Sequence, residues 1–342
     1  MFIRKFIFPK SLIRKIVKSI FGDNVYSFFG LVVMLTLFIG YLFVSFNYQG
    51  NYSFLTYKLD SSEKLAPPFL FNSQNESKSK SLDGSGSNFL FDNSNSSVEN
   101  LSTNGDSNFN NKLFLLGTNS EGRDLFTYLF LGFGIYIIGG FIALLVSLIF
   151  GTILGSMSAY FEPGLISNIA KFIEDIINSF PKIIILFLAL ILFGVSLYPI
   201  MITIGIINST NISKALYQKI KYLKNNEFID SARQLGLNDL NILIRHILYY
   251  NCRDIFIVYG VFVIADAILL ESTLAYLNFG IDWNNIINGI NVKSWGTYLA
   301  EGKEYILSGK TWITIFPAIF LLLLLMSLNF IGEELKKRFH VK

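Results

Sequence analysis

The chain has 342 residues, of which 52% are hydrophobic and only 15% are charged, and its mean hydropathy is +0.49. Soluble domains carry more charge than this, so the composition excludes an ordinary soluble globular protein. The formal net charge of +4 comes from Lys and Arg residues beside apolar runs. That pattern is typical of membrane topology and gives no indication of a nucleic-acid partner. The one cysteine, Cys252, excludes an internal disulfide, and no metal site is predicted.

Apolar runs that approach or exceed the roughly twenty residues needed to cross a bilayer recur along the chain. The run 183–207 is too broken for one helix, because Gly194 and Pro199 interrupt it. We therefore predict one span over 165–193, kinked at Pro181, and a shorter span over 197–212. The predicted fold is an all-α membrane protein with six transmembrane helices. In chain order these helices fall within 26–46, 133–160, 165–193, 197–212, 256–277 and 312–330.

Positive charge sets the predicted orientation. Lys and Arg are concentrated in segment 1–24, in the connection 213–253 between the fourth and fifth spans, and in the tail 336–342. The positive-inside rule places all three in the cytoplasm, and two cytoplasmic termini agree with an even number of spans. The first span indicates a retained signal-anchor helix rather than a cleaved secretion signal. The predicted divisions are the basic segment 1–24, the first helix 25–48, an extracytoplasmic loop 49–124, a core of five spans 125–335 and the basic tail 336–342.

The outer loop contains a segment of a different kind. Residues 72–111 are dominated by Ser, Asn, Asp and Gly. Such a composition buries too little apolar area to offset chain entropy, so we predict that this segment is largely disordered. It is either a docking loop for a partner or a tolerated insertion. The low entropic cost of extra loop length favours the insertion.

The run LLGTNSEGRDLFTYLFLGFG, residues 115–134, precedes the second span. Gly117 and Gly122 allow tight turns, and the adjacent Arg123 and Asp124 can cap a helix or contact phosphate or protein at the membrane interface. We take this run as a candidate motif on the outer side. Its residues are Gly117, Thr118, Gly122, Arg123 and Asp124.

The connection between the fourth and fifth spans contains EFIDSARQLGLNDLNILIRHIL, residues 227–248. The spacing predicts a short helix that Asn225 or Asn226 can cap and that Gly236 ends. Asn238 or Asp239 can cap a second helix that leads to the fifth span. The apolar side chains expected on one face of the first helix are Phe228, Ile229, Ala232 and Leu235. Such a helix either presents a surface to a partner or is an amphipathic linker at the membrane interface.

These motifs together resemble the C-type permease subunit of the dipeptide/oligopeptide importers of the ATP-binding-cassette (ABC) class. Residues 227–248 resemble the EAA loop of such permeases, with Asp230 and Ser231 in place of the family's Glu and Ala. The outer run resembles the family's Gly-Thr-Asp-x-x-Gly-Arg-Asp, with Asn119 in place of its first Asp. Further matches at 175–181, 271–280, 294–302 and 329–335 follow in the family's order.

The resemblance implies a mechanism and a set of partners. The EAA loop is the socket for an ATPase subunit, and its matching residues here are Glu227, Asp230, Ser231, Ala232, Arg233 and Gly236. The implied partners are a second homologous permease, two ATPase subunits that hold ATP and Mg²⁺, and an extracytoplasmic substrate-binding protein. The chain itself is expected to bind no cofactor and to lie in the bacterial inner membrane. The family implies peptide substrates, although similar permeases carry nickel and other small solutes.

Acids within or near the spans must face protein, water or the interface, because burial in lipid is costly. For Glu174 and Asp175 we favour helix–helix hydrogen bonding or capping, and Asp266 belongs to the same group of acids. Glu271 is equally compatible with a structural role and with a place in the substrate path. Glu271 and Tyr276 are therefore candidates for a path or gate.

Two other classes of function are alternatives to an importer subunit. A secondary transporter or channel for a small solute would lack a reason for the helix pair around Gly236. A membrane-embedded enzyme is the weakest alternative, because the sequence contains no HExxH and no Gly-x-Ser-x-Gly motif. It also has no phosphate-binding loop, so ATP hydrolysis is expected only on partner subunits.

Overall fold

The computed structural model describes residues 25–48, 68, 115–280, 282–283 and 292–339. These residues are almost entirely helical, in agreement with the predicted class, apart from one antiparallel pair of two-residue strands. The predicted segment 1–24 and the low-complexity segment 72–111 lie outside the described residues. The elements are α2 (Val25–Tyr48), α3 (Leu125–Tyr160), α4 (Leu165–Ser179), α5 (Lys182–Phe193), α6 (Leu197–Lys224), α7 (Glu227–Gln234), α8 (Asp239–Asn241), the π-helical η3 (Ile242–Tyr249), α9 (Arg253–Leu274), the π-helical η4 (Ala275–Phe279), β1 (Asp282–Trp283), β2 (Val292–Lys293), α10 (Trp295–Ile306) and α11 (Trp312–Phe339).

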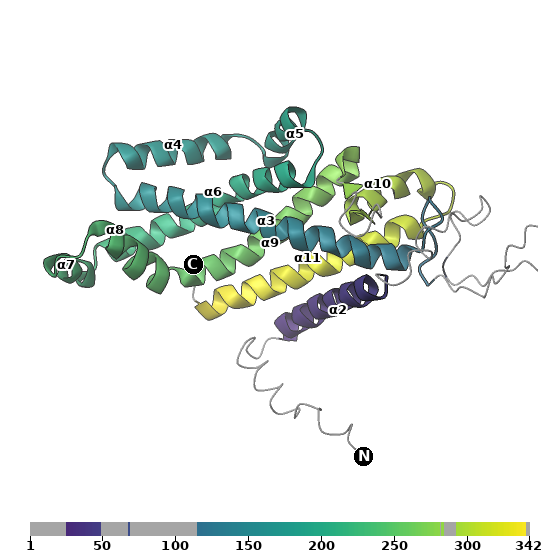
Figure 1. Cartoon of the computed structure of the whole chain (residues 1–342), viewed down its shortest axis with the longest axis horizontal. Coiled ribbons are helices and arrows are strands. Elements are labelled where there is room, and N and C mark those ends of the chain that lie inside the picture. Colours follow the sequence, from purple (N-terminus) through teal and green to yellow (C-terminus); the bar gives the residue numbers. More distant parts are fainter. Residues whose placement is uncertain (1–24, 49–67, 69–114, 281, 284–291, 340–342) are drawn as a thin grey trace, which may run out of the picture.

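The long helices form one bundle (Figure 1), in which α3, α6, α9 and α11 run side by side and α2 lies against α11. The start of α2 packs on the end of α11, because Ser327 donates to the Gly30 carbonyl and Tyr26 contacts Phe330. Helices α7 and α8 lie at the same end of the bundle as the end of α11, and α10 lies at the opposite end. We call these the α7 end and the α10 end.

Four described helices are long and apolar enough to cross a membrane, or five spans exist if one bent pair counts as a single span. The four are Tyr26–Phe46, Leu125–Tyr160, Arg253–Phe279 and Trp312–Phe339. The predicted span 197–212 is instead the first part of the much longer α6, which carries polar residues such as Asn208 and Asn211 along its length. Each of the six predicted spans therefore coincides with a helix or a bent helix pair, but length and hydropathy alone support four or five.

The kink predicted at Pro181 is a complete break. Helices α4 and α5 meet at 91°, and Phe180 between them is extended, with φ −108° and ψ 141°. A proline disfavours helical geometry at the residue before it and supplies no N–H to continue the helical hydrogen bonds. A new helix therefore starts at Lys182 in another direction, and it ends at Gly194, whose φ is +77°.

Close backbone contact joins α3 and α6. A Cβ atom on Gly151 would lie 2.7 Å from the Ser209 carbonyl oxygen, and one on Gly155 would lie 2.8 Å from the Ser213 carbonyl oxygen. Glycines four residues apart form a shallow groove that lets a second helix approach, which is a common packing mode within membranes. The facing positions on α6 are small as well, and the two helices share the most extensive contact in the bundle.

An aromatic anchor fixes the α10 end. Trp295, the first residue of α10, is fully buried and donates from its indole Nε1 to the Leu129 carbonyl over 2.7 Å. Its backbone N–H donates to the Tyr136 hydroxyl over 3.1 Å, and its ring lies near those of Tyr136 and Phe320. Buried indole and phenol groups need such partners, so these bonds hold the start of α10 against α3.

The glycine groove gives the first prediction. Gly151→Leu should force α3 and α6 apart and lower the free energy of unfolding by about 1–3 kcal/mol or more, since overpacking a tight contact costs that much. The measurement is the heating temperature at which half of the detergent-solubilised protein is lost from the monodisperse peak. Leu145→Phe adds bulk on an exposed part of α3 and serves as the control. Equal heat resistance of the two variants would contradict the role of the groove.

Candidate functional site

The helix predicted at the α7 end is present with the expected boundaries. It runs from Glu227 to Gln234, with Asn226 at the N-cap position. Its end is a Schellman motif, in which the Gly236 N–H donates to the Arg233 carbonyl over 2.9 Å and the Leu237 N–H donates to the Ala232 carbonyl over 3.2 Å. Gly236 has φ +81°, which explains why the sequence has glycine there.

The four apolar residues expected on one face of the first short helix differ in burial. Ile229 and Ala232 are buried against the bundle, but Phe228 is 40% exposed and Leu235 is 82% exposed. Since α7 has only eight residues, its two apolar pairs point in different directions. One pair holds the helix to the chain, and the other lies on the outer surface together with the exposed Leu237.

The polar residues of α7 lie in local contacts. Glu227 and Asp230 occupy the first turn, where the helix dipole favours acids. The Ser231 hydroxyl donates to the Glu227 carbonyl over 2.9 Å, and the Arg233 Nη1 lies 3.7 Å from the Asp230 Oδ1. Of the predicted coupling residues, Ala232 is buried and the other five are exposed.

Asp239 connects α7 to the end of α3. Its Oδ1 accepts from the Tyr160 hydroxyl over 2.7 Å and from the Arg233 Nε over 3.1 Å. The hydrogen bond from Tyr160 and the Arg233 guanidinium hold the pKa of Asp239 below its usual value. Lys224, the last residue of α6, donates to the Tyr160 carbonyl over 2.8 Å. Helices α7, α8, α3 and α6 are therefore joined by these contacts around Tyr160.

The predicted outer motif forms a compact turn before α3. Gly117 and Gly122 both have φ +80°, as tight turns built on glycine require. The buried Asn119 accepts at its Oδ1 from the Glu121 and Arg123 N–H groups, over 3.0 and 2.8 Å. A neutral amide thus supplies the acceptor that the turn needs. Thr118 forms a backbone bridge with Asp124.

The adjacent charges at the start of α3 have partners within the chain. Asp124 is the N-cap, and its Oδ2 accepts from the Thr127 N–H over 3.1 Å and from the Thr127 hydroxyl over 2.6 Å. Arg123 lies 3.2 Å from the Glu121 carboxylate and donates to the Tyr128 hydroxyl over 2.9 Å. Both residues therefore stabilise the turn, and a role in binding a partner stays a prediction.

Lys293 joins this turn to α10. Its ammonium lies 2.6 Å from the Glu121 carboxylate and also pairs with Glu301. Glu301 in turn accepts from the Ser120 hydroxyl over 3.2 Å. Burial raises the pKa of Glu121, but the hydrogen bond and charge of Lys293 and the nearby Arg123 outweigh it and leave that pKa below its usual value. No spacing pattern predicts this cluster, because Glu121 lies 172 residues before Lys293 and Ser120 lies 181 residues before Glu301.

The two path candidates have different environments. Glu271 is buried where α9 meets α10, and its Oε2 lies 3.5 Å from the Ser272 hydroxyl. Ser272 also contacts the Tyr136 hydroxyl, 3.1 Å away. Tyr276 is exposed, and the Lys303 ammonium lies 4.4 Å from the centre of its ring. The structure does not bring Glu271 and Tyr276 into a common site.

Of the four acids noted in the spans, Glu174 is buried and accepts from the Ser213 hydroxyl of α6. This is the helix–helix hydrogen bond favoured from the sequence. Asp266 lies beside Lys182, a residue that sequence reasoning missed. The available signal was a lysine directly after Pro181 at the head of an apolar run. Among the described residues no group of three or more His, Cys, Asp or Glu could hold a metal ion.

The cluster around Lys293 gives a second prediction. Lys293→Met should leave Glu301 without its cation and Glu121 with Arg123 alone, and so lower the free energy of unfolding by about 1–3 kcal/mol. Protease cleavage in the loop before α3 should then become faster in the intact membrane-embedded protein. Lys303→Met removes a lysine from the exposed side of α10 and should have a smaller effect. Equal cleavage rates for the two variants would show that the cluster does not hold the turn.

Comparison with known proteins adds independent evidence. Residues 151–341 match the family described as the binding-protein-dependent transport system inner membrane component. The oligopeptide transport system permease protein OppC of Haemophilus influenzae is 32% identical over 64% of this chain and 68% of its own length. The dipeptide transport system permease protein DppC of Alkalihalophilus pseudofirmus is 30% identical over 64% and 69%. A solved inward-facing structure of the MetNI methionine ABC transporter covers 61% of this chain and 92% of its own, with TM-score 0.44 and 14% identity.

Proposed function

Because this chain belongs to the inner membrane components of binding-protein-dependent transport systems, we propose that it imports oligopeptides or dipeptides as one of two permease subunits. The names of the relatives OppC and DppC support this substrate class. The second permease is homologous, and the two enclose a path across the bacterial inner membrane. Two ATPase subunits hold ATP and Mg²⁺, and an extracytoplasmic binding protein delivers the peptide.

The observation that carries this proposal is the exposed apolar surface of α7. Leu235, just after α7, is 82% exposed, and Phe228, Leu237 and Leu240 in the same short segment of the chain are exposed as well. Exposed apolar residues that gather at one place mark sites of protein–protein contact. This surface lies at the α7 end of the bundle (Figure 1), where an ATPase subunit can reach it.

The same helix is anchored well enough to transmit motion. Ile229 is fully buried against the chain, and Asp239 links Arg233 to Tyr160 at the end of α3. Movement of docked ATPase subunits on ATP binding therefore displaces α7 together with α3 rather than bending a loop. Rigid-body displacement of packed helices is a common route between two conformations of a protein. It turns the path from inward-facing to outward-facing.

Both termini lie in the cytoplasm in this proposal, and the chain crosses the membrane six times. Two crossings come from α6 and from the bent pair α4–α5. Basic residues in the last turns of α6 and α11 support a cytoplasmic α7 end. The outer motif and α10 then face the binding protein.

A reporter fusion tests this orientation. A reporter that is active only in the cytoplasm, fused after Lys342, should be active. The same reporter inserted after Leu307, in the exposed turn behind α10, should be inactive at equal expression. The reverse pattern, or activity at both sites, would overturn the proposed topology.

A pair of leucines tests the docking surface. Leu235→Asp should lower peptide-stimulated ATPase activity of the assembled importer about tenfold or more, since a charge at the centre of an interface removes a hot spot. The protein level in the membrane should not change, because the Leu235 side chain is largely exposed. Co-purification of the ATPase subunits with this chain should fall in parallel.

Leu307→Asp is the matched control. Leu307 is 97% exposed and, like Leu235, is the C-cap residue of its helix, but it lies at the α10 end. Its ATPase activity should equal that of the wild type. Wild-type activity of Leu235→Asp would show that α7 is an interfacial linker rather than a docking helix.

A further inference from the structure

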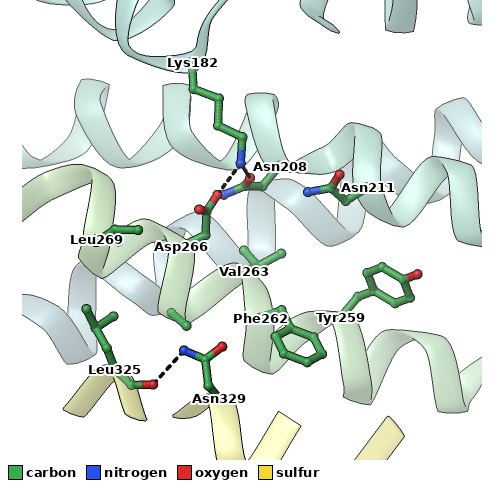
Figure 2. Close-up of a pocket in the computed structure, with 11 residues that line it drawn as sticks. Lys182, Asn208, Asn211, Tyr259, Phe262, Val263, Asp266, Leu269, Leu325 and Asn329 are labelled. Carbon is green, nitrogen blue, oxygen red and sulfur yellow. Dashed lines mark hydrogen bonds and ion pairs between the residues drawn. The ribbon is translucent and has the colours of Figure 1, made fainter. Parts of the chain in front are cut away.

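A polar recess of about 300 Å³ opens between α6, α9 and α11. Figure 2 shows Lys182 reaching from the start of α5 to Asp266 and Asn208. The Lys182 ammonium lies 2.6 Å from the Asp266 Oδ2 and 3.1 Å from the Asn208 Oδ1. Asn211 and Asn329 line the remaining polar part of the recess, with Tyr259 and Phe262 as its aromatic part.

The recess is unsuited to lipid. Asp266 lies well inside the apolar helix Arg253–Phe279, yet its side chain is 29% exposed, and that of Lys182 is 41% exposed. Charged groups within a membrane face protein or water, because hydrocarbon cannot solvate them. The open side of the recess therefore faces water in a path rather than the acyl chains.

Asn208 points to a ligand. It is fully buried, and within the described part of the chain its Nδ2 has no hydrogen-bond partner. Buried amide N–H groups are nearly always satisfied, so this donor indicates an acceptor that is absent from the chain alone. The neighbouring Asn211 is exposed and supplies a second amide on the same helix face.

The charges limit the chemistry of that ligand. One ammonium and one carboxylate neutralise each other, so the recess favours neither a simple anion nor a simple cation. A zwitterion is compatible with both charged side chains, because its carboxylate can bind Lys182 and its ammonium can bind Asp266. Asparagine amides match the donors and acceptors of peptide groups. A volume of about 300 Å³ is at the lower end of the range for small-ligand sites, which is adequate for one or two amino-acid residues.

We propose that this recess binds the charged terminus and the adjoining backbone amides of a short peptide during its passage through the importer. The proposal rests on the proposed function and names the contact that the path makes with its substrate. In the empty state Lys182 and Asp266 satisfy each other. In the occupied state a peptide terminus takes over one half of the pair and hydrogen-bonds the Asn208 Nδ2.

Thiol labelling tests whether peptide occupies the recess. The only cysteine of the chain, Cys252, is buried, and burial together with the Asp254 charge raises the pKa of its thiol to about 12. Asn211→Cys and Asn329→Cys therefore each add one reactive thiol to this chain. The assembled importer, in nanodiscs with ATP and binding protein, is treated with a negatively charged methanethiosulfonate, and labelling of this chain is followed by mass.

We expect both thiols to be labelled and an equimolar mixture of di- and tripeptides of Ala, Leu and Phe to slow the labelling about tenfold, as for a site that excludes the reagent when occupied. Leu307→Cys should be labelled with or without peptide. Ile149→Cys, on an exposed apolar part of α3, should not be labelled. Absence of labelling at both recess thiols, or labelling that peptide does not slow, would overturn the proposal.

A second measurement separates binding from helix support. Lys182→Met should slow uptake of peptides with a free C-terminal carboxylate about tenfold more than uptake of their C-terminal amides, relative to wild type, since only the acids lose a charge-assisted bond. An equal loss of uptake for peptide acids and peptide amides would show that the Lys182–Asp266 pair only holds α5 against α9. A wild-type importer that takes up neither peptide class would refute the proposed function itself. Normal uptake with an unchanged acid-to-amide ratio would refute only the recess.

Discussion

Hydrocarbon cannot form hydrogen bonds, and this constraint favours hydrogen bonds and ion pairs between helices of the bundle. Glu174 on α4 is satisfied by Ser213 on α6, and Lys182 on α5 is satisfied by Asp266 on α9. The hydroxyl of Tyr136 receives the first N–H of α10. These bonds connect helices that are apolar elsewhere and that would otherwise have little reason to prefer one neighbour over another. Close backbone packing at Gly151 and Gly155 also joins α3 to α6.

Helix α3 connects the two ends of the molecule. Its 36 residues begin at the Asp124 cap beside the glycine turn and end at Tyr160, which donates to Asp239 between the two short helices. Helix α3 is continuous over these residues. The groove around Gly151 and Gly155 holds its second half to α6. A displacement of α7 is therefore transmitted to α3 as a whole. The outer turn, tied by Lys293 to α10, is the part of the chain that has to accommodate it.

Local sequence signals predicted much of this structure, and long-range contacts account for what they missed. Gly236 and Gly122 were correctly assigned to turns because a positive φ is a property of one residue. A kink at Pro181 was also predicted, but the structure has two separate helices there, at 91° to each other. Periodicity placed Leu235 on one face with Ile229 and Ala232, but those two residues are buried whereas Leu235, the C-cap residue, is exposed. Asp266 lies 84 residues from Lys182, and Glu121 lies 172 residues from Lys293, so no spacing rule could identify these two pairs.

The break at Pro181 creates the polar recess as well as the bend. A continuous helix from α4 into α5 would carry Lys182 along the axis of α4. At 91° to that axis, α5 instead starts beside the middle of α6 and α9, where Lys182 meets Asn208 and Asp266. With 12 residues, α5 is only about 18 Å long, too short to cross a bilayer alone. Its exposed apolar side chains, such as Leu188 and Ile191, suit the membrane interior. A proline that shortens a span thereby places an ammonium group inside the bundle, which an uninterrupted apolar helix could not do.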